Sequence, residues 1–316
     1  MANVTASMVK ELRDKTGAGM MDCKTALTET GGDIEQAIDW LRKKGLSKAA
    51  KKADRVAADG LIGIALEGTT GALVEVNSET DFVARNETFQ TMVRQIAALA
   101  VKAGGDLAKL LAMPYPGKGH SVDDHVKEMI ATIGENMSVR RTASLSAPDG
   151  AVASYIHNRV ADNVGRIGVL VALSSSGDKS KLAEIGRQIA LHVAAASPQA
   201  ATIEQLDKAL IERERGVYLE QAMASGKPKE IVEKMVEGRL RKEFFGQVVL
   251  TEQIFMGPGG DGKITVAQYL KGEEKTVGGP IKVEGFVRYA LGEGIERKTT
   301  DFAAEVAAAA GLSKRN

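Results

Sequence analysis

Two neighbouring stretches decide the fold: GLIGIALEG at residues 60–68 and GALVEVNS at residues 71–78. Both are rich in apolar residues, and threonines and glycines separate them as in a β-hairpin. The residues that follow place Phe89, Met92 and Ile96 at helical spacing. We therefore predict a β-β-α unit.

The same order of patterns recurs further along the chain. GAVASYIHN at 150–158 and GRIGVLVALS at 165–174 are strand candidates, and helical spacing follows at 182–193. The letters Arg-Gln-Ile-Ala occur in both predicted helices, at 94–97 and at 187–190. Repetition at this scale predicts a duplicated ββα core of two half-domains in a protein of the α+β class.

A small helical module precedes this core. Thr5 or Ser7 can cap a first helix, GAG at 17–19 ends it, and a second helix runs from Met20 to Thr28. Asp33 can cap a third helix, after which a Lys- and Ala-rich connector is expected. So small a core, with two adjacent methionines after a turn, favours a docking role over a catalytic one.

A helical insertion interrupts the second half-domain. Thr202 to Gln205 resembles a capping box, and SGKP at 225–228 turns the chain, which predicts an antiparallel coiled-coil hairpin. The residues expected in its apolar seam are Ile203, Leu206, Leu210, Val217, Ile231, Met235 and Leu240. We then expect strands at 247–255 and 285–294, and a C-terminal helix capped by Thr300 or Asp301.

These elements divide the chain into five parts. The predicted domains are 1–54 (helical module), 55–148 (first half of the core), 149–200 with 246–290 (second half), 201–245 (hairpin) and 291–316 (C-terminal helical module).

Composition limits the possible functions. The 316 residues carry 42 basic and 41 acidic side chains, so overall charge favours neither nucleic acid nor membrane binding. The basic run from Lys43 to Arg55 is interpreted as a solvated helix face rather than a phosphate-binding patch. One cysteine, no signal-like start and no long apolar stretch predict a soluble cytoplasmic protein.

Motifs for chemistry are weak. GPGGDGKI at 257–264 follows the phosphate-loop pattern as far as Lys263, but Ile264 stands where Ser or Thr would hold magnesium. We interpret it as a surface loop, and we expect the next helix to start at Thr265. His120 and His125 lie near acidic residues but are expected to be ordinary surface polar residues. We therefore predict no catalytic residue, no cofactor and no metal site.

The junction NSETDFVARN, residues 77–86, places acidic Asp81 beside the large aromatic Phe82. Counting back seven residues from Phe89 puts Phe82 on the buried stripe of the helix, with Asp81 as a cap. Against this, the equivalent junction of the second half, SSSGDK, has no such pair. The other interpretation is an exposed wedge held at a strand-to-helix corner.

This junction closely resembles the signature of bacterial elongation factor Ts, the nucleotide exchange factor for the GTPase elongation factor Tu. Further matching stretches lie in the same order along nearly the whole chain: VKELRDKTGAGMMDCKTAL at 9–27, IGENMSVRR at 133–141, GRIGVLVAL at 165–173, SGKPKEIVEKMVEGRL at 225–240 and GEGIERKTTDFAAEVAA at 292–308. The segments 103–122 and 257–263 depart from the family pattern.

The resemblance implies a ubiquitin-associated-like N-terminal module and a partner-binding wedge formed by Thr80, Asp81, Phe82 and Val83. It implies supporting contacts from Leu12, Met20, Met21, Ile133, Gly134, Glu135, Asn136, His157, Phe255 and Met256. For Glu135 and Asn136, an ordinary helix end or turn is the alternative. The C-terminal helix is also expected to grip the GTPase, and the hairpin can support a homodimer.

The implied mechanism is that Phe82 enters an apolar pocket of elongation factor Tu while Asp81 disturbs its magnesium and phosphate site, so that GDP leaves. No covalent chemistry is expected. Two alternatives stay open: a docking or chaperone-like protein that does not affect nucleotide, and a nucleotide-binding enzyme that uses Gly262 and Lys263.

Overall fold

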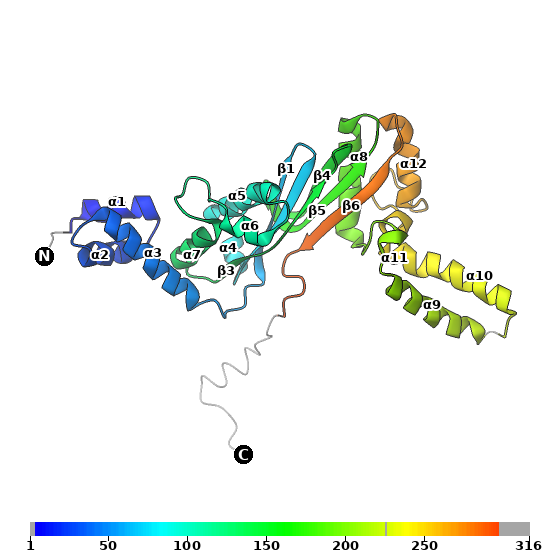
Figure 1. Cartoon of the computed structure of the whole chain (residues 1–316), viewed down its shortest axis with the longest axis horizontal. Coiled ribbons are helices and arrows are strands. Elements are labelled where there is room, and N and C mark those ends of the chain that lie inside the picture. The colour runs from blue at the N-terminus through cyan, green and yellow to red at the C-terminus, as the bar shows by residue number, and fades with distance from the viewer. Residues whose placement is uncertain (1–3, 225, 297–316) are drawn as a thin grey trace, which may run out of the picture.

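The computed structural model describes residues 4–224 and 226–296, and its elements form a chain of parts from the N-terminal helices to a distant hairpin (Figure 1). The first part contains α1 (Ala6–Thr16), α2 (Met20–Glu29) and α3 (Ile34–Ala50). Thr5 caps α1 by accepting a hydrogen bond from the Met8 amide, and Asp33 caps α3 in the same way through Gln36. Both caps were predicted, and Leu12, Cys23 and Leu27 form the core between the helices.

Helix α3 continues to Ala50, so Lys43, Lys44 and Lys48 lie on a helix, as the interpretation of the basic run as a helix face requires. Asp22 of α2 pairs with Lys44 at 3.2 Å and with Lys48 at 2.8 Å. The basic run is therefore partly neutralised within the chain.

The first half of the core is the predicted β-β-α unit with additions. Strands β1 (Asp59–Glu67) and β2 (Thr70–Ser78) form a hairpin, followed by α4 (Asp81–Ala84) and α5 (Glu87–Ala103). The chain then forms α6 (Leu107–Ala112), α7 (Val122–Ile133) and a strand that was not predicted, β3 (Met137–Ser146), which pairs with β2. One apolar cluster joins α5, α7 and the inner residues of these strands.

The second half repeats the arrangement with β4 (Gly150–Ala161), β5 (Val164–Ser174) and α8 (Lys179–Ala196). Its strand β6 (Lys282–Ala290) pairs with β5, as predicted for this region. Strand β1 pairs with β5 at Ile62 and Gly63, and this pairing joins the strands of both halves into one antiparallel sheet.

The two halves meet through the sheet face that their helices do not cover. Ile62, Ile64 and Leu73 of the first half pack with Val152 and Leu170 of the second. Gly168 permits this close approach, because an added Cβ would lie 2.6 Å from Ile62. Mixed helix and sheet therefore make this an α+β protein.

The inserted hairpin consists of α9 (Lys208–Met223) and α10 (Lys229–Arg239), and it extends away from the core (Figure 1). The predicted cap was wrong, because Asp207 caps α9, whereas Thr202 precedes only a short 3₁₀ turn, Ile203–Gln205. The predicted seam is confirmed in part, because Leu206 and Leu240 are buried and Ile203 and Leu210 pack against them. Val217 and Ile231 are exposed instead, and Ala222, Val232 and Val236 complete the seam.

The strand predicted at 247–255 is also wrong. A π-helical turn, Leu240–Phe245, leads into α11 (Gly246–Val248) and a 3₁₀ turn, Leu250–Glu252. Val249, Leu250 and Phe255 of this stretch are buried in the clusters of the core and the hairpin, which accounts for the strand-like pattern. Helix α12 (Val266–Val277) then begins with a capping box at Thr265, where the sequence placed its start.

Two remaining predictions concern the chain as a whole. The C-terminal helix expected after Thr300 lies outside the described residues. Within residues 4–224 and 226–296, no helix combines the length and the apolar character needed to cross a lipid bilayer.

Candidate partner-binding site

The candidate site is the corner where β2 passes into α4. Helix α4 is a single turn, and Asn86 then caps a separate helix, α5, by accepting hydrogen bonds from the amides of Thr88 and Phe89. Because the helix restarts at Asn86, a count back from Phe89 does not predict the face on which Phe82 lies. The interpretation of Phe82 as a buried core residue is therefore wrong.

Phe82 is 72% exposed, whereas Val83 and Ala84 beside it are buried in the first-half core. The turn is thus anchored by one side and presents its aromatic ring on the other. Asp81 pairs with Arg85 at 3.0 Å, and the Arg85 guanidinium lies 5.8 Å from the centre of the Phe82 ring. Such an exposed ion pair contributes little to stability, so Asp81 can exchange it for another partner at small cost.

Glu135 holds the start of the turn. Its carboxylate accepts a hydrogen bond from the Thr80 amide at 3.0 Å and another from the Thr80 hydroxyl at 2.7 Å. Hydrogen bonds to a charged acceptor are stronger than neutral ones. Glu135 is thus a polar support of the corner, although it is 55 residues away in sequence.

Asn136 connects the corner to the chain that arrives from the N-terminal helices. Its amide donates to Glu79 at 2.6 Å, and its side chain donates to the carbonyl of Arg55 at 2.7 Å. Gly134, which ends α7 with a φ of 92°, accepts a hydrogen bond from Lys52. Glu135 and Asn136 thus lie at a helix end and also form hydrogen bonds that hold the corner. A contact of either residue with a partner stays a prediction.

The beginning of the junction motif has a structural role. Asn77 is buried, and its side-chain amide donates to the Asp59 carbonyl and to Glu75, both at 3.1 Å. Ser78 is buried as well and donates to the Thr80 carbonyl at 3.0 Å. NSETDFVARN thus divides into a buried anchor, Asn77 and Ser78, and an exposed turn.

The N-terminal site residues fall into two groups. Met20 and Met21, at the start of α2, are 60% and 73% exposed and form an apolar surface. Leu12 is completely buried in the core of the module, so it cannot contact a partner directly in this structure. Ile133 is half-buried and packs against the first-half core.

The second-half residues are similarly divided. His157 on β4 and Met256 are exposed. Phe255 is only 1% exposed, because its ring stacks on Tyr269 with centroids 4.0 Å apart. Phe255 is therefore a core residue, and only its neighbours Ile254 and Met256 reach the surface.

Sequence reasoning missed several residues that shape the site. Glu79 accepts a hydrogen bond from the Asn136 amide and forms an ion pair with Arg55 at 3.5 Å. Glu75 accepts a hydrogen bond from the Asn77 side chain. Glu79 and Glu75 lie in or beside the motif, but Asn136 and Arg55, which contact Glu79, are distant from it in sequence. The motif indicated a site from sequence alone. Only the folded structure shows that Glu75 is completely buried, whereas Glu79 is partly exposed.

The glycine-rich stretch at 257–264 forms a loop that Asp261 closes by accepting from the amides of Lys263 and Ile264. These two backbone donors are therefore already satisfied within the loop. The loop leads to Thr265 and α12 rather than opening a helix directly. This agrees with its interpretation as a surface loop.

Comparison with known proteins gives a consistent result. The family model described as elongation factor TS matches residues 79–293, which include the corner and most of both halves of the core. The elongation factor Ts of Parvibaculum lavamentivorans is 62% identical over 310 residues, covering 98% of this chain and 99% of the relative. That of Rhodospirillum centenum is 57% identical over 311 residues, covering 98% of this chain and all of the relative. On these matches, the chain belongs to the elongation factor Ts family.

Proposed function

We propose that this translation elongation factor promotes release of GDP from elongation factor Tu, with the turn Thr80–Val83 as the part that acts on the GTPase. The observation that carries the proposal is the exposure of Phe82 on a turn whose other side is buried. A large apolar side chain held in this way loses little conformational freedom on binding, which favours its use as an interface anchor.

The proposed mechanism is a linkage between two binding equilibria. A GTPase holds GDP through its phosphate loop and magnesium. Phe82 enters an apolar pocket of the GTPase, and Asp81 leaves Arg85 to approach the magnesium and phosphate site. If the factor binds the nucleotide-free form more tightly, it must weaken nucleotide binding by the same ratio. No covalent bond is made or broken by this chain.

The other surfaces are proposed to position the wedge. Met20 and Met21 offer an apolar contact at one end of the molecule, and His157 and Met256 offer contacts on the second half. Leu12 and Phe255 act indirectly, by packing the elements that carry these contacts. Separate apolar clusters in the module, the two halves and the hairpin support the division into domains proposed from the sequence.

The test is stopped-flow release of a fluorescent GDP from elongation factor Tu. For Phe82→Ala we expect a loss of about 2 kcal/mol or more at the contact, or about thirtyfold slower factor-dependent release at limiting factor concentration. The melting temperature should stay unchanged, because Phe82 is 72% exposed. Met223→Ala, at an exposed position on the hairpin, is the matched control and should behave as the native chain does.

Two outcomes contradict the proposal. Native protein that binds the GTPase without accelerating GDP release would favour a docking or chaperone-like protein. Equal acceleration of GDP release by the native and Phe82→Ala chains would exclude the role of Phe82 as the wedge.

A homodimer through the hairpin stays a separate prediction, and sedimentation equilibrium of the native chain tests it.

A further inference from the structure

Two histidines and a glutamate meet beside the N-terminal helices, away from the corner. His125 and Glu128 lie one turn apart on α7, and His120 lies in the loop before it. His120 and His125 were expected to be surface polar residues. That expectation is wrong for His125, which is buried because its ring stacks on Tyr115 with centroids 3.7 Å apart.

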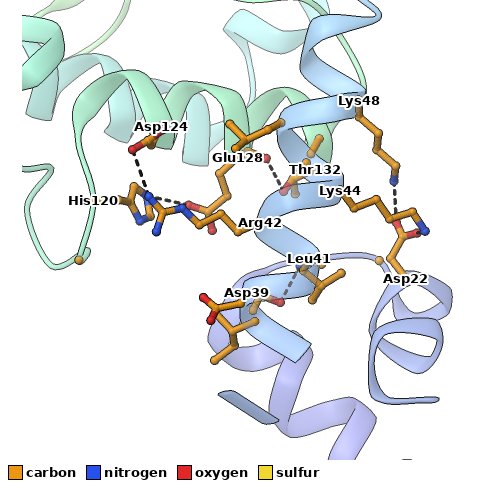
Figure 2. A pocket seen from close by; sticks show the side chains of 18 residues that line it. Asp22, Asp39, Leu41, Arg42, Lys44, Lys48, His120, Asp124, Glu128 and Thr132 are labelled. Carbon is orange, nitrogen blue, oxygen red and sulfur yellow. Dashed lines mark hydrogen bonds and ion pairs between the residues drawn. The ribbon is translucent and has the colours of Figure 1, made fainter. Parts of the chain in front are cut away.

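The three side chains converge on one carboxylate oxygen. Glu128 Oε2 lies 2.9 Å from His125 Nδ1 and 3.3 Å from His120 Nε2. One ligand atom from each residue can be chosen so that all three lie within 4.8 Å of one another. Figure 2 shows that the side chains of His120 and Glu128 face each other. Both residues line a cavity of about 270 Å³ that opens to solvent.

His120 Nε2 is the unusual atom of the group. It is buried, and within the described part of the chain it makes no hydrogen bond. Its 3.3 Å separation from Glu128 Oε2 satisfies the distance for an ion pair but not the direction of a hydrogen bond. A buried polar atom without a partner is destabilising, and a bound cation would satisfy it.

We propose that His120, His125 and Glu128 form a binding site for one divalent transition-metal ion of the Zn²⁺ type. Imidazole nitrogen and carboxylate oxygen are the ligands that such an ion prefers, and two histidines with one glutamate leave a fourth position for water. Ligands at about 2.0–2.2 Å from a tetrahedral ion lie about 3.3 Å apart, so His120 and Glu128 already have the required separation. His125 and Glu128 need to separate by only a few tenths of an ångström.

The surroundings hold the ligands in place. The Tyr115 amide donates to the His120 carbonyl at 3.0 Å, and the Val122 amide donates to the Met113 carbonyl at 2.9 Å, which closes the loop that carries His120. Such outer contacts orient metal ligands and contribute to affinity.

Two cations lie near the site and bear on its affinity. Lys118 lies 3.3 Å from Glu128 Oε1, the oxygen that does not face the histidines, and Arg42 is engaged by Asp124 at 3.2 Å. The metal can therefore bind at Oε2 while Lys118 stays at Oε1. Because the positive charge of Lys118 repels a metal ion bound to the same carboxylate, removal of Lys118 should strengthen metal binding.

The experiment is calorimetric titration of Zn²⁺ into the full-length, tag-free chain after treatment with a chelator. We expect one Zn²⁺ per chain and at least about tenfold weaker binding in both His120→Gln and Glu128→Gln. Lys118→Met should bind more tightly than the native chain. His157→Gln and Cys23→Ser, which change two other side chains that could bind zinc, should bind as the native chain does.

A second readout separates a built site from weak surface binding. Zn²⁺ that binds the folded chain must raise its melting temperature as the concentration of free Zn²⁺ increases, and this rise should disappear in His120→Gln. Mg²⁺ at the same concentration should produce neither heat nor stabilisation, because it prefers oxygen ligands. Absence of Zn²⁺ binding, or binding that both His120→Gln and Glu128→Gln retain, would overturn the proposal.

Discussion

At the scale of single residues, Phe82 and Val83 are adjacent but have opposite environments, because a one-turn helix directs them to different sides. Val83 is buried in the first-half core, and Phe82 projects into solvent. The direction of Phe82 is therefore set by residues that need not touch a partner themselves. Thr80 and Glu135 are the clearest of these, since two hydrogen bonds join them.

Replacing Glu135 tests that positioning role. Glu135→Ala removes both hydrogen bonds to Thr80, and each bond to a charged group contributes about 1.5–3 kcal/mol. We expect a lower melting temperature and slower GDP release, although Phe82 itself is unchanged. Stopped-flow release and thermal unfolding measure the two effects. Glu87→Ala, an exposed acid at the start of α5, is the control.

Unchanged GDP release by Glu135→Ala, together with a lower melting temperature, would show that Glu135 stabilises the fold without positioning the wedge. The distinction matters because Glu135 lies at a helix end, where a purely structural role would be ordinary.

At the scale of elements, Asp22 shows how the small N-terminal module remains folded. The hydrogen bond from Lys48 lowers the pKa of Asp22 most strongly; burial opposes this effect, and Lys44 adds to it. These contacts connect α2 to the middle of α3. A three-helix module with so small a core depends on such contacts more than a large domain does.

This lowered pKa gives a prediction for pH. The ionised Asp22 stabilises the fold above its ordinary pKa of 3.8, and this contribution is lost as pH falls through the lower folded-state pKa. Asp22→Asn should therefore lower the urea midpoint of the module at neutral pH and have progressively less effect below pH 3.8. Fluorescence of Trp40, the single tryptophan of the chain, reports the transition from within α3.

Asp14→Asn is the matched control, since Asp14 is exposed on α1 and its replacement should leave the midpoint unchanged at either pH. If Asp22→Asn lowers the urea midpoint as much at low pH as at neutral pH, the stabilisation does not come from the ionised carboxylate of Asp22, and the prediction is wrong.

At the scale of the whole molecule, the parts are joined by buried polar contacts as well as by apolar packing. Glu75 on β2 is completely buried and accepts from Arg140 and Arg141 of β3, with the shortest contact at 2.5 Å to Arg141. It also accepts from the Gly292 amide at 2.8 Å, which lies beyond β6. One carboxylate thus connects the first half of the core to the end of the second.

Removal of Glu75 should be strongly destabilising. Breaking a buried ion pair typically costs about 3–5 kcal/mol, and we expect Glu75→Ala to fall near the lower end of this range. The two arginine side chains are 28% and 29% exposed, so water can partly solvate them. Chemical denaturation followed by circular dichroism measures the loss. Glu67→Ala, at the exposed end of β1, should cost less than about 0.5 kcal/mol.

The sequence determined the features that depend on neighbouring residues. Alternation and turn residues indicated the hairpin of β1 and β2, caps indicated α1, α3 and α12, and the junction motif indicated the family before any contact was known. These signals are local, because a cap or a strand pattern acts within a few residues. The local pattern failed where packing selected another structure, as at 247–255 and on the hairpin seam.

Only the tertiary structure decided which of the indicated residues are exposed. It placed Phe82 in solvent and buried Leu12 and Phe255, because burial depends on elements that arrive from elsewhere in the chain. It also brought Glu135 to Thr80 and joined His120 and His125 to Glu128. Such contacts arise when packing brings distant segments together, which no local pattern of residues specifies.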